Sequence, residues 1–127
     1  MNEQTIIDYW AEKANEDLAS AQENFLAGRF LNAVRDSYFA CFHAFSSVLL
    51  QSGKTFQKHK EVRSALHRDY IRLKKMDPKW GKHYDWLYDN RQKADYRPLV
   101  KFEAEQVKEI IEQSRAFIEE MRRLVSP

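Results

Sequence analysis

Apolar residues recur every three to four positions along most of the chain, which is the spacing that gathers side chains on one face of an α-helix. The pattern is plainest near the start, where its apolar positions are Ile7, Ala11, Ala14, Leu18, Ala21 and Phe25. Similar patterns predict five helices, over residues 5–27, 29–52, 59–75, 79–96 and 101–125. The sequence lacks apolar runs with a period of two and the Asn-Gly or Asp-Gly pairs of tight hairpins, so no strand is expected.

The residues around these segments are of the kinds that begin or end helices. Thr5 or Asp8 is expected to cap the first helix, and Gly28 and Gly53 are natural stops for the first and second. Short connections between long amphipathic helices favour antiparallel neighbours. We therefore predict an all-α fold, an antiparallel up-and-down four-helix bundle with an additional shorter helix, in which residues 1–127 form a single domain.

The second predicted helix is apolar over more of its circumference than the others. Its main stripe comprises Phe30, Val34, Tyr38, Cys41, Phe45, Val48 and Leu49. Phe39, Phe42 and Leu50 lie off this stripe and are also apolar. A helix of this kind is buried on more than one side. It is either the central helix of the bundle or a helix at a subunit interface, where aromatic residues are enriched.

Composition narrows the class of protein. The 127 residues include only three glycines, and the glycine-rich loops of phosphate- and dinucleotide-binding enzymes are absent. The single cysteine, Cys41, allows no intrachain disulfide, and the phenylalanines around it are typical of a buried, unreactive thiol. The acidic start does not resemble a signal peptide, and no apolar run approaches membrane-spanning length, so we expect a soluble, cytoplasmic protein that does not contact membranes.

Charge is unevenly distributed although the net charge is only +2. Residues 1–26 carry six acidic side chains and one basic one, whereas residues 54–83 carry ten basic side chains and three acidic ones. The basic segment predicts a polyanionic partner such as RNA. Alternatively, the acidic first helix packs beside the basic segment and neutralises it.

Residues that bind metals or attack substrates give little signal. The four histidines, His43, His59, His67 and His83, do not follow the ligand spacing of a zinc site. No serine lies in the strand–turn–helix elbow that activates a nucleophile. We therefore predict no metal and no cofactor.

The stretch that ends the fourth predicted helix carries the densest polar chemistry. Arg91 and Asp95 are four residues apart and share a helix face, and Tyr96 follows just before Pro98. Arg91 can hold a phosphate through two parallel hydrogen bonds, with Asp95 orienting it and Tyr96 donating to a phosphate or ribose oxygen. Arg91 and Asp95 can equally form an ion pair that clamps the helix end. The residue pattern alone leaves both interpretations open.

Four parts of the sequence resemble the small prokaryotic HEPN-domain proteins, in the same order and at similar spacing. They are GRF at 28–30 with Ala33, DSYFACFHA at 36–44, FQKHKEV at 56–62 and RQKADY at 91–96. The resemblance covers nearly the whole chain. It implies a helical bundle that forms homodimers with a site near the dimer cleft, and frequent genetic pairing with a small nucleotidyltransferase as a toxin–antitoxin couple. It also implies that active members are metal-independent endoribonucleases.

The nuclease motif of such proteins is an arginine, a polar residue and then a histidine a few positions further on. Arg91 and Gln92 match its first part, but the histidine positions hold Tyr96, Arg97 and Pro98. The sequence is instead similar to a branch of the family that carries Arg-x-x-Ala-Asp-Tyr here. Tyrosine has an unperturbed pKa of about 10 and a carboxylate one of about 4, so neither readily replaces a histidine that titrates near neutrality.

Two histidines elsewhere are candidates for the missing group. His59 is the first and His43 the second, although His59 also suits a helix start and His43 a core position. The resemblance thus implies a catalytic set of Arg91, Asp95 and Tyr96, with His59 and His43 as further candidates. The predicted phosphate-binding residues are Arg91, Lys58, His59, Lys60 and Arg63.

We therefore predict a HEPN-type RNA- or nucleotide-binding protein, the toxin-like partner of a nucleotidyltransferase antitoxin. Its endoribonuclease motif is degraded, because Arg91 is kept and the histidine is replaced by Tyr96. Cleavage of RNA stays open. The competing hypothesis is a non-catalytic helical module for dimerisation and protein interaction, in which Arg91 and Asp95 lock the fourth helix.

Overall fold

The computed structural model describes residues 2–55, 58–96 and 101–125, with the backbone alone for residues 94–96. Its helices are α1 (Glu3–Leu26), α2 (Phe30–Gln51), α3 (His59–Leu66), the single π-helical turn η1 (His67–Ile71), α4 (Pro78–Tyr96) and α5 (Ala104–Val125). The described residues contain no strand, and none of their helices has the length and apolar character of a membrane span. The predicted all-α fold is confirmed.

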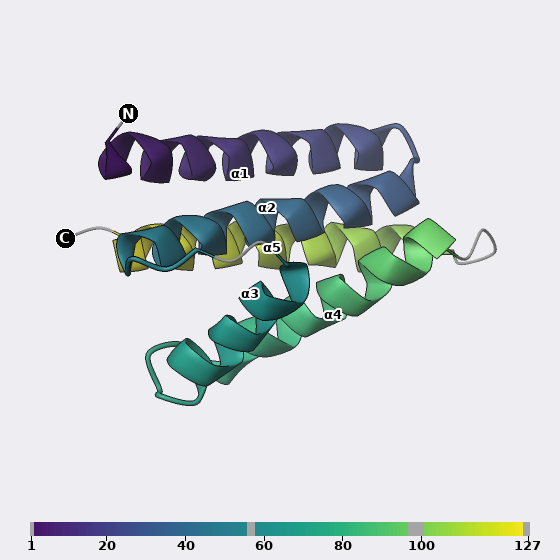
Figure 1. The fold of residues 1–127 in the computed structure, drawn as a ribbon. Helices are drawn as coiled ribbons and strands as arrows, with labels where there is room; N and C mark the ends of the chain where they lie inside the picture. Colours follow the sequence, from purple (N-terminus) through teal and green to yellow (C-terminus); the bar gives the residue numbers. More distant parts are fainter. Residues whose placement is uncertain (1, 56–57, 97–100, 126–127) are drawn as a thin grey trace.

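The long helices run alternately up and down, as Figure 1 shows. α1 and α2 form an antiparallel pair, α5 packs against both, and α4 packs on α2. α2 touches α1, α3, α4 and α5, so the first of the two alternatives, the central helix of the bundle, describes its place in the chain. The largest fully buried side chains come from four of these helices and include Tyr38, Tyr84, Phe45, Phe117, Leu66 and Leu87.

The helix ends follow local side-chain chemistry. α1 begins earlier than predicted, because the Oδ1 atom of Asn2 accepts a hydrogen bond from the Thr5 N–H at 2.8 Å. Asn2 is therefore the cap, and the expected cap at Thr5 or Asp8 is wrong. Gly28 and Gly53 both adopt a φ of 78° just after α1 and α2, as expected of helix stops.

The third predicted helix, over residues 59–75, is the largest departure from the sequence pattern. It is α-helical only to Leu66 and continues as the π-helical turn η1, followed by Lys74 with a φ of 60°. A π turn holds an extra residue and so rotates the positions after it. In a continuous helix Leu73 would follow Val62, Leu66 and Tyr70 on one apolar stripe. After the π turn it is 57% exposed, while Tyr70 is buried.

A glycine lets η1 approach α4. A Cβ atom at Gly81 would lie 2.8 Å from Cε1 of His67, which is closer than such atoms pack. The Nε2 atom of His67 lies 2.9 Å from Oδ1 of Asp85 on α4. Gly81 and this partly exposed pair lie where η1 packs on α4.

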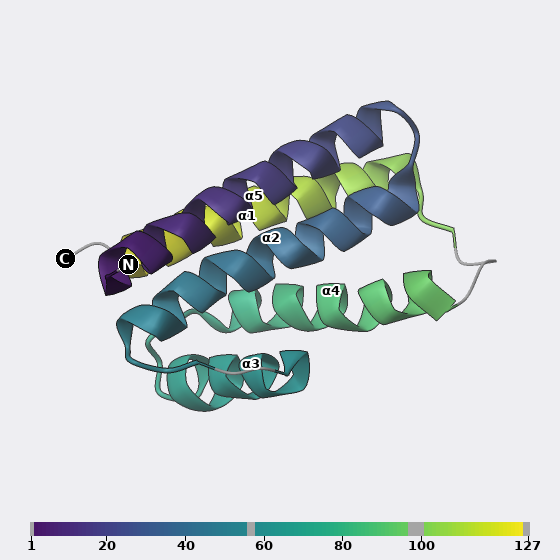
Figure 2. The same ribbon diagram turned by 45° about the horizontal axis from the view of Figure 1, so that its top comes forward.

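The acidic and basic parts of the chain lie on opposite sides of α2. α1 packs on α2 and α5 and, within the described residues, makes no contact with α3 or η1. Figure 2 shows α1 on one side of α2 and α3 on the other. The alternative in which the first helix neutralises residues 54–83 is therefore wrong for a single chain. The basic side chains of α3 and η1 remain available to a partner.

Candidate nucleic-acid interface

The guanidinium of Arg91 lies on aromatic rings of α2. Arg91 is half-buried near the end of α4. Its Cζ atom lies 4.7 Å from the ring centre of Tyr38 and 5.7 Å from that of Phe39. Its Nε atom is buried, with no hydrogen-bond partner among the described residues. Stacking on two rings thus fixes the cation in place, while part of its hydrogen-bonding capacity is unused.

His59 meets Arg91 at the same phenol. His59 is the first residue of α3, and its Nδ1 atom lies 2.7 Å from Oη of Tyr38. Its ring stacks on Phe42, with ring centres 4.4 Å apart and planes 15° apart. These contacts occupy Nδ1 and one ring face. They leave Nε2 without a hydrogen-bond partner among the described residues.

Burial and nearby charges act on the titration of this cluster. Burial, followed by the positive charge of Arg91 and then by His43, lowers the pKa of His59. Burial raises the pKa of the Tyr38 phenol to about 12. Near neutral pH the imidazole is therefore uncharged and the phenol keeps its proton. One hydrogen then joins Tyr38 Oη and His59 Nδ1, and the tautomer of His59 decides which atom donates it.

His43, on α2, is held by residues of α1. Its Nδ1 atom lies 2.5 Å from Oδ2 of Asp17, and both side chains are largely buried. The Trp10 ring stacks on it, with ring centres 5.1 Å apart and planes 12° apart. Phe39 stacks on the imidazole as well, at 6.0 Å. Asp17 and Trp10 thus fix the orientation of the second candidate histidine.

We call this group the Tyr38 cluster. Its members come from four helices and are Trp10, Asp17, Tyr38, Phe39, Phe42, His43, His59 and Arg91. The linear motif lacks a histidine after Arg91, but the fold brings His59 to the phenol on which Arg91 stacks. Sequence reasoning missed Tyr38, Asp17 and Trp10. Tyr38 was assigned only to the core stripe, and the other two lie far from the motif in the sequence, on α1.

Basic residues continue from the cluster along α3. Lys58 and Lys60 flank His59 and are exposed. The guanidinium of Arg63 lies 4.4 Å from the ring centre of Tyr88, and one of its nitrogens is 3.7 Å from Oδ1 of Asp89. The Tyr88 ring in turn lies edge-on to Tyr38, at 6.2 Å. The rings of Tyr88 and Tyr38 therefore lie between the guanidiniums of Arg63 and Arg91.

Two of the predicted site residues cannot be placed in this geometry. The backbone of Asp95 and Tyr96 ends α4, but their side chains lie outside the described residues. Arg97 and Pro98 lie outside them altogether. The predicted ion pair between Arg91 and Asp95 and the predicted role of Tyr96 therefore stay predictions.

The described residues show neither a reactive thiol nor a cluster of metal ligands. Burial raises the pKa of the Cys41 thiol to about 12, which confirms the prediction of an unreactive buried cysteine. No three His, Cys, Asp or Glu side chains of the described chain gather in a way that would hold a metal ion.

Comparisons with known proteins extend over nearly the same span as the motifs. A family model described as the HEPN domain matches residues 7–124. A UPF0332 protein of Thermotoga maritima is 35% identical over 126 residues, which cover 98% of this chain and 96% of the relative. A protein of Methanocaldococcus jannaschii that bears the name of a candidate toxin is 24% identical over 113 residues, which cover 88% of this chain and 76% of the relative.

Proposed function

This chain belongs to the HEPN domain family, and on that premise we propose that it is a toxin-like protein that binds single-stranded RNA or nucleotides at the Tyr38 cluster. The single observation that carries the proposal is the guanidinium of Arg91, stacked on Tyr38 and unpaired at its buried Nε. A half-buried arginine held on aromatic rings is suited to a phosphate, which accepts two parallel hydrogen bonds from a guanidinium.

The surroundings of Arg91 support an extended polyanion. Lys58, Lys60 and Arg63 add positive charge on α3, and α1 does not neutralise this side of the molecule. Tyr88 lies between Arg63 and the cluster. Proteins that bind single-stranded nucleic acids combine cations for the backbone with aromatic rings for the bases. In this proposal the chain of cations follows successive phosphates, and Asp95 and Tyr96 orient Arg91 and contact sugar or phosphate.

His59 gives the proposal a candidate acid–base group. Metal-independent cleavage moves a proton from the 2′-hydroxyl to a base as O2′ bonds to phosphorus, and a second proton reaches O5′ as the P–O5′ bond breaks. Because the lowered pKa of His59 keeps it neutral near pH 7, Nε2 can accept a proton when Nδ1 donates to Tyr38. Arg91 would stabilise the charge that develops on the phosphorane. His43 is the second acid–base candidate.

The test is an incubation of the purified protein with single-stranded RNA in the presence of a chelator, beside the variant His59→Ala. We expect the variant to cleave roughly 100-fold more slowly, because positioned acid–base groups contribute about 10²–10⁴-fold. Its RNA affinity should change little, because a neutral imidazole adds no charge to phosphate binding. Cleavage is measured by the loss of full-length RNA and affinity by filter binding.

The matched control is His67→Ala, which removes a histidine of η1 that pairs with Asp85 outside the cluster. This control should cleave like the unmodified protein. Equal cleavage by His59→Ala would remove His59 from the mechanism. If the unmodified protein binds RNA in a salt-sensitive way without cleaving it, the proposed cleavage is contradicted and the proposed RNA binding is supported. Absence of both binding and cleavage contradicts the whole proposal.

The proposed partner is a small nucleotidyltransferase that acts as the antitoxin. This step rests on the family and on the relative that bears the name of a candidate toxin. The neighbouring gene provides the check. A small nucleotidyltransferase encoded beside this chain supports a toxin–antitoxin pair, whereas its absence leaves RNA or nucleotide binding without this partner.

We also propose that the protein is a homodimer that pairs through α2 or the end of α4. Phe39 and Phe42 on α2 are only half-buried in the single chain and are of the type enriched at interfaces. Light scattering at micromolar concentration should therefore give twice the chain mass of 15.2 kDa. Phe42→Glu should shift the mass toward the monomer, because an interface does not accept an unpaired carboxylate.

The control for the dimer is Leu73→Glu, at an apolar residue that is 57% exposed outside α2 and α4. It should leave the mass unchanged. A monomer mass for the unmodified protein would contradict the dimer but not RNA binding by the single chain.

A further inference from the structure

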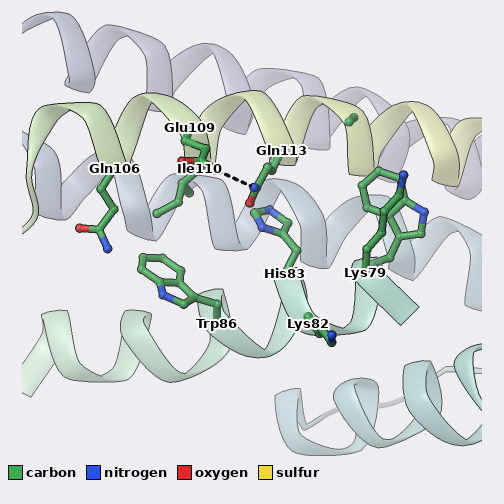
Figure 3. Close-up of a pocket in the computed structure, with 10 residues that line it drawn as sticks. Lys79, Lys82, His83, Trp86, Gln106, Glu109, Ile110 and Gln113 are labelled. Atoms are coloured by element: carbon green, nitrogen blue, oxygen red, sulfur yellow. Dashed lines mark hydrogen bonds between the residues drawn. The ribbon is translucent and has the colours of Figure 1, made fainter. Parts of the chain in front are cut away.

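A hollow lies between α4 and α5, away from the Tyr38 cluster. Both helices pack on α2, their backbones come close to each other at few positions, and Figure 3 shows side chains from each entering the space between them. This α4–α5 trough has a volume of about 550 Å³, within the usual range of small-molecule sites. It shares no residue with the Tyr38 cluster.

Two tryptophans of α4 form its aromatic side. Trp80 and Trp86 are half-buried, and each packs on a core phenylalanine, Phe117 or Phe102, with ring centres 5.9 Å apart. The Nζ atom of Lys79 lies 4.8 Å from the Trp80 ring centre, so that indole already has a cation over it. No cation of the described residues lies over Trp86, which projects into the trough in Figure 3. It is therefore the ring on which a planar ligand would stack.

The α5 side supplies primary amides. Gln106 and Gln113 line the trough, and the Nε2 atom of Gln113 donates to Oε1 of Glu109 at 3.2 Å. An amide offers a donor and an acceptor on one planar group, which is the complement of a nucleobase edge. The floor is uncharged near neutrality, because burial lowers the pKa of His83 to about 4 and its Nε2 lies 3.0 Å from Oγ of Ser114.

Positive charge is confined to one end of the trough. Lys79 and Lys82 are exposed there, against the single carboxylate of Glu109, so the lining has an excess of positive charge. Trp86 lies six residues beyond Trp80 on α4, about 9 Å along the helix axis. The stacking ring and the lysine end are thus separated by a span comparable with that between the base and the phosphate of a nucleotide.

We propose that the α4–α5 trough binds a nucleoside monophosphate, with the base on Trp86, the base edge at Gln106 and Gln113, and the phosphate at Lys79 and Lys82. This site goes beyond the RNA interface proposed above. It would let the protein respond to a free nucleotide while the Tyr38 cluster holds RNA.

Tryptophan fluorescence tests the trough directly. The chain has three tryptophans, so Trp10→Phe leaves the two indoles of the trough as reporters. We expect AMP to quench this variant saturably below about 1 mM. Adding Gln113→Ala or Lys82→Ala should weaken AMP binding about tenfold, as expected for the loss of one hydrogen bond or one ionic contact. Both residues are exposed, and circular dichroism verifies that the variants fold.

Two further arms separate this site from the RNA interface. Adding Arg91→Ala should leave the AMP midpoint unchanged, and inorganic phosphate alone should not reproduce the quenching. The proposal is overturned if AMP does not quench, if Arg91→Ala abolishes the quenching, or if phosphate alone reproduces it. Quenching that rises with protein concentration without nucleotide would assign the trough to a second copy of the chain and also overturn it. None of these outcomes depends on whether the protein binds RNA.

Discussion

Arg91→Ala is expected to weaken the binding of single-stranded RNA by about 10- to 100-fold, because a charged hydrogen-bonding contact contributes about 1.5–3 kcal/mol. In the same variant cleavage should fall further, since the guanidinium would also stabilise charge that develops only in the transition state. The slope of affinity against salt should decrease by roughly one phosphate contact, about 0.7 on logarithmic axes for a single strand. Fluorescence anisotropy at several salt concentrations measures all but the cleavage rate.

The stability of the variant decides between a ligand site and a structural clamp. The cation–π contact with Tyr38 is worth about 0.5–2 kcal/mol, but the unpaired Nε buried beside it costs roughly 1–3 kcal/mol. These contributions oppose each other, so we expect the free energy of unfolding to change little. A clamp built on a buried ion pair would instead lose several kcal/mol. Denaturant titration of both proteins measures the difference.

Two substitutions serve as controls for Arg91. Arg91→Lys keeps the charge but removes the planar donor pair, so it should recover part of the affinity and little of the cleavage. Arg72→Ala removes an exposed arginine just beyond η1 and should reduce the affinity by a smaller factor. RNA binding by Arg91→Ala equal to that of the unmodified protein would contradict the proposed site. A loss of several kcal/mol in the free energy of unfolding, without a specific effect on RNA affinity, would also contradict it.

The helices were predictable because burial follows sequence periodicity. Ile7, Ala14, Leu18 and Ala21 recur at helical spacing and are buried where α1 meets α2 and α5. The positive φ of Gly53 likewise follows from the absence of a side chain. The π turn at η1 was not predictable, because the apolar spacing of residues 59–75 also fits a continuous α-helix. The exposure of Leu73 beyond this turn was therefore not predictable either.

The candidate site was predictable only in part, because its geometry is made by the fold. Arg91 and the two histidines, His43 and His59, were named from the motif and from residue type. The meeting of Arg91 and His59 at Tyr38 was not, because it requires α2, α3 and α4 to converge. The uneven distribution of charge was visible in the sequence. Only the position of α1 shows that this acidic helix does not neutralise the basic residues 54–83. The roles of Asp95 and Tyr96 stay predictions.

A buried histidine makes the protein sensitive to acid. His83 is 8% exposed beneath the α4–α5 trough, and burial lowers its pKa to about 4, whereas an unfolded histidine titrates near 6.5. Between these two pH values His83 is protonated in the unfolded chain but not in the folded chain. The free energy of unfolding therefore falls as pH falls from about 6.5 to 4, by about 3 kcal/mol in total. The lowered pKa of His59 acts in the same direction.

Substitution isolates the contribution of His83 from those of other groups. Asp36 has a raised pKa, mainly through burial, and such a carboxyl group opposes the histidines at the acidic end of the range. His83→Gln removes the titration while keeping a polar side chain near Ser114. Denaturant unfolding at about pH 7 and pH 4.5 should therefore show a loss about 2–3 kcal/mol smaller in this variant than in the unmodified protein. The same substitution at His67, which is partly exposed beside Asp85, is the control and should reproduce neither the size nor the range of the change. An unaltered pH dependence in His83→Gln would mean that the acid sensitivity arises elsewhere. Glutamine does not titrate and therefore cannot replace the proton that His83 binds in the unfolded chain.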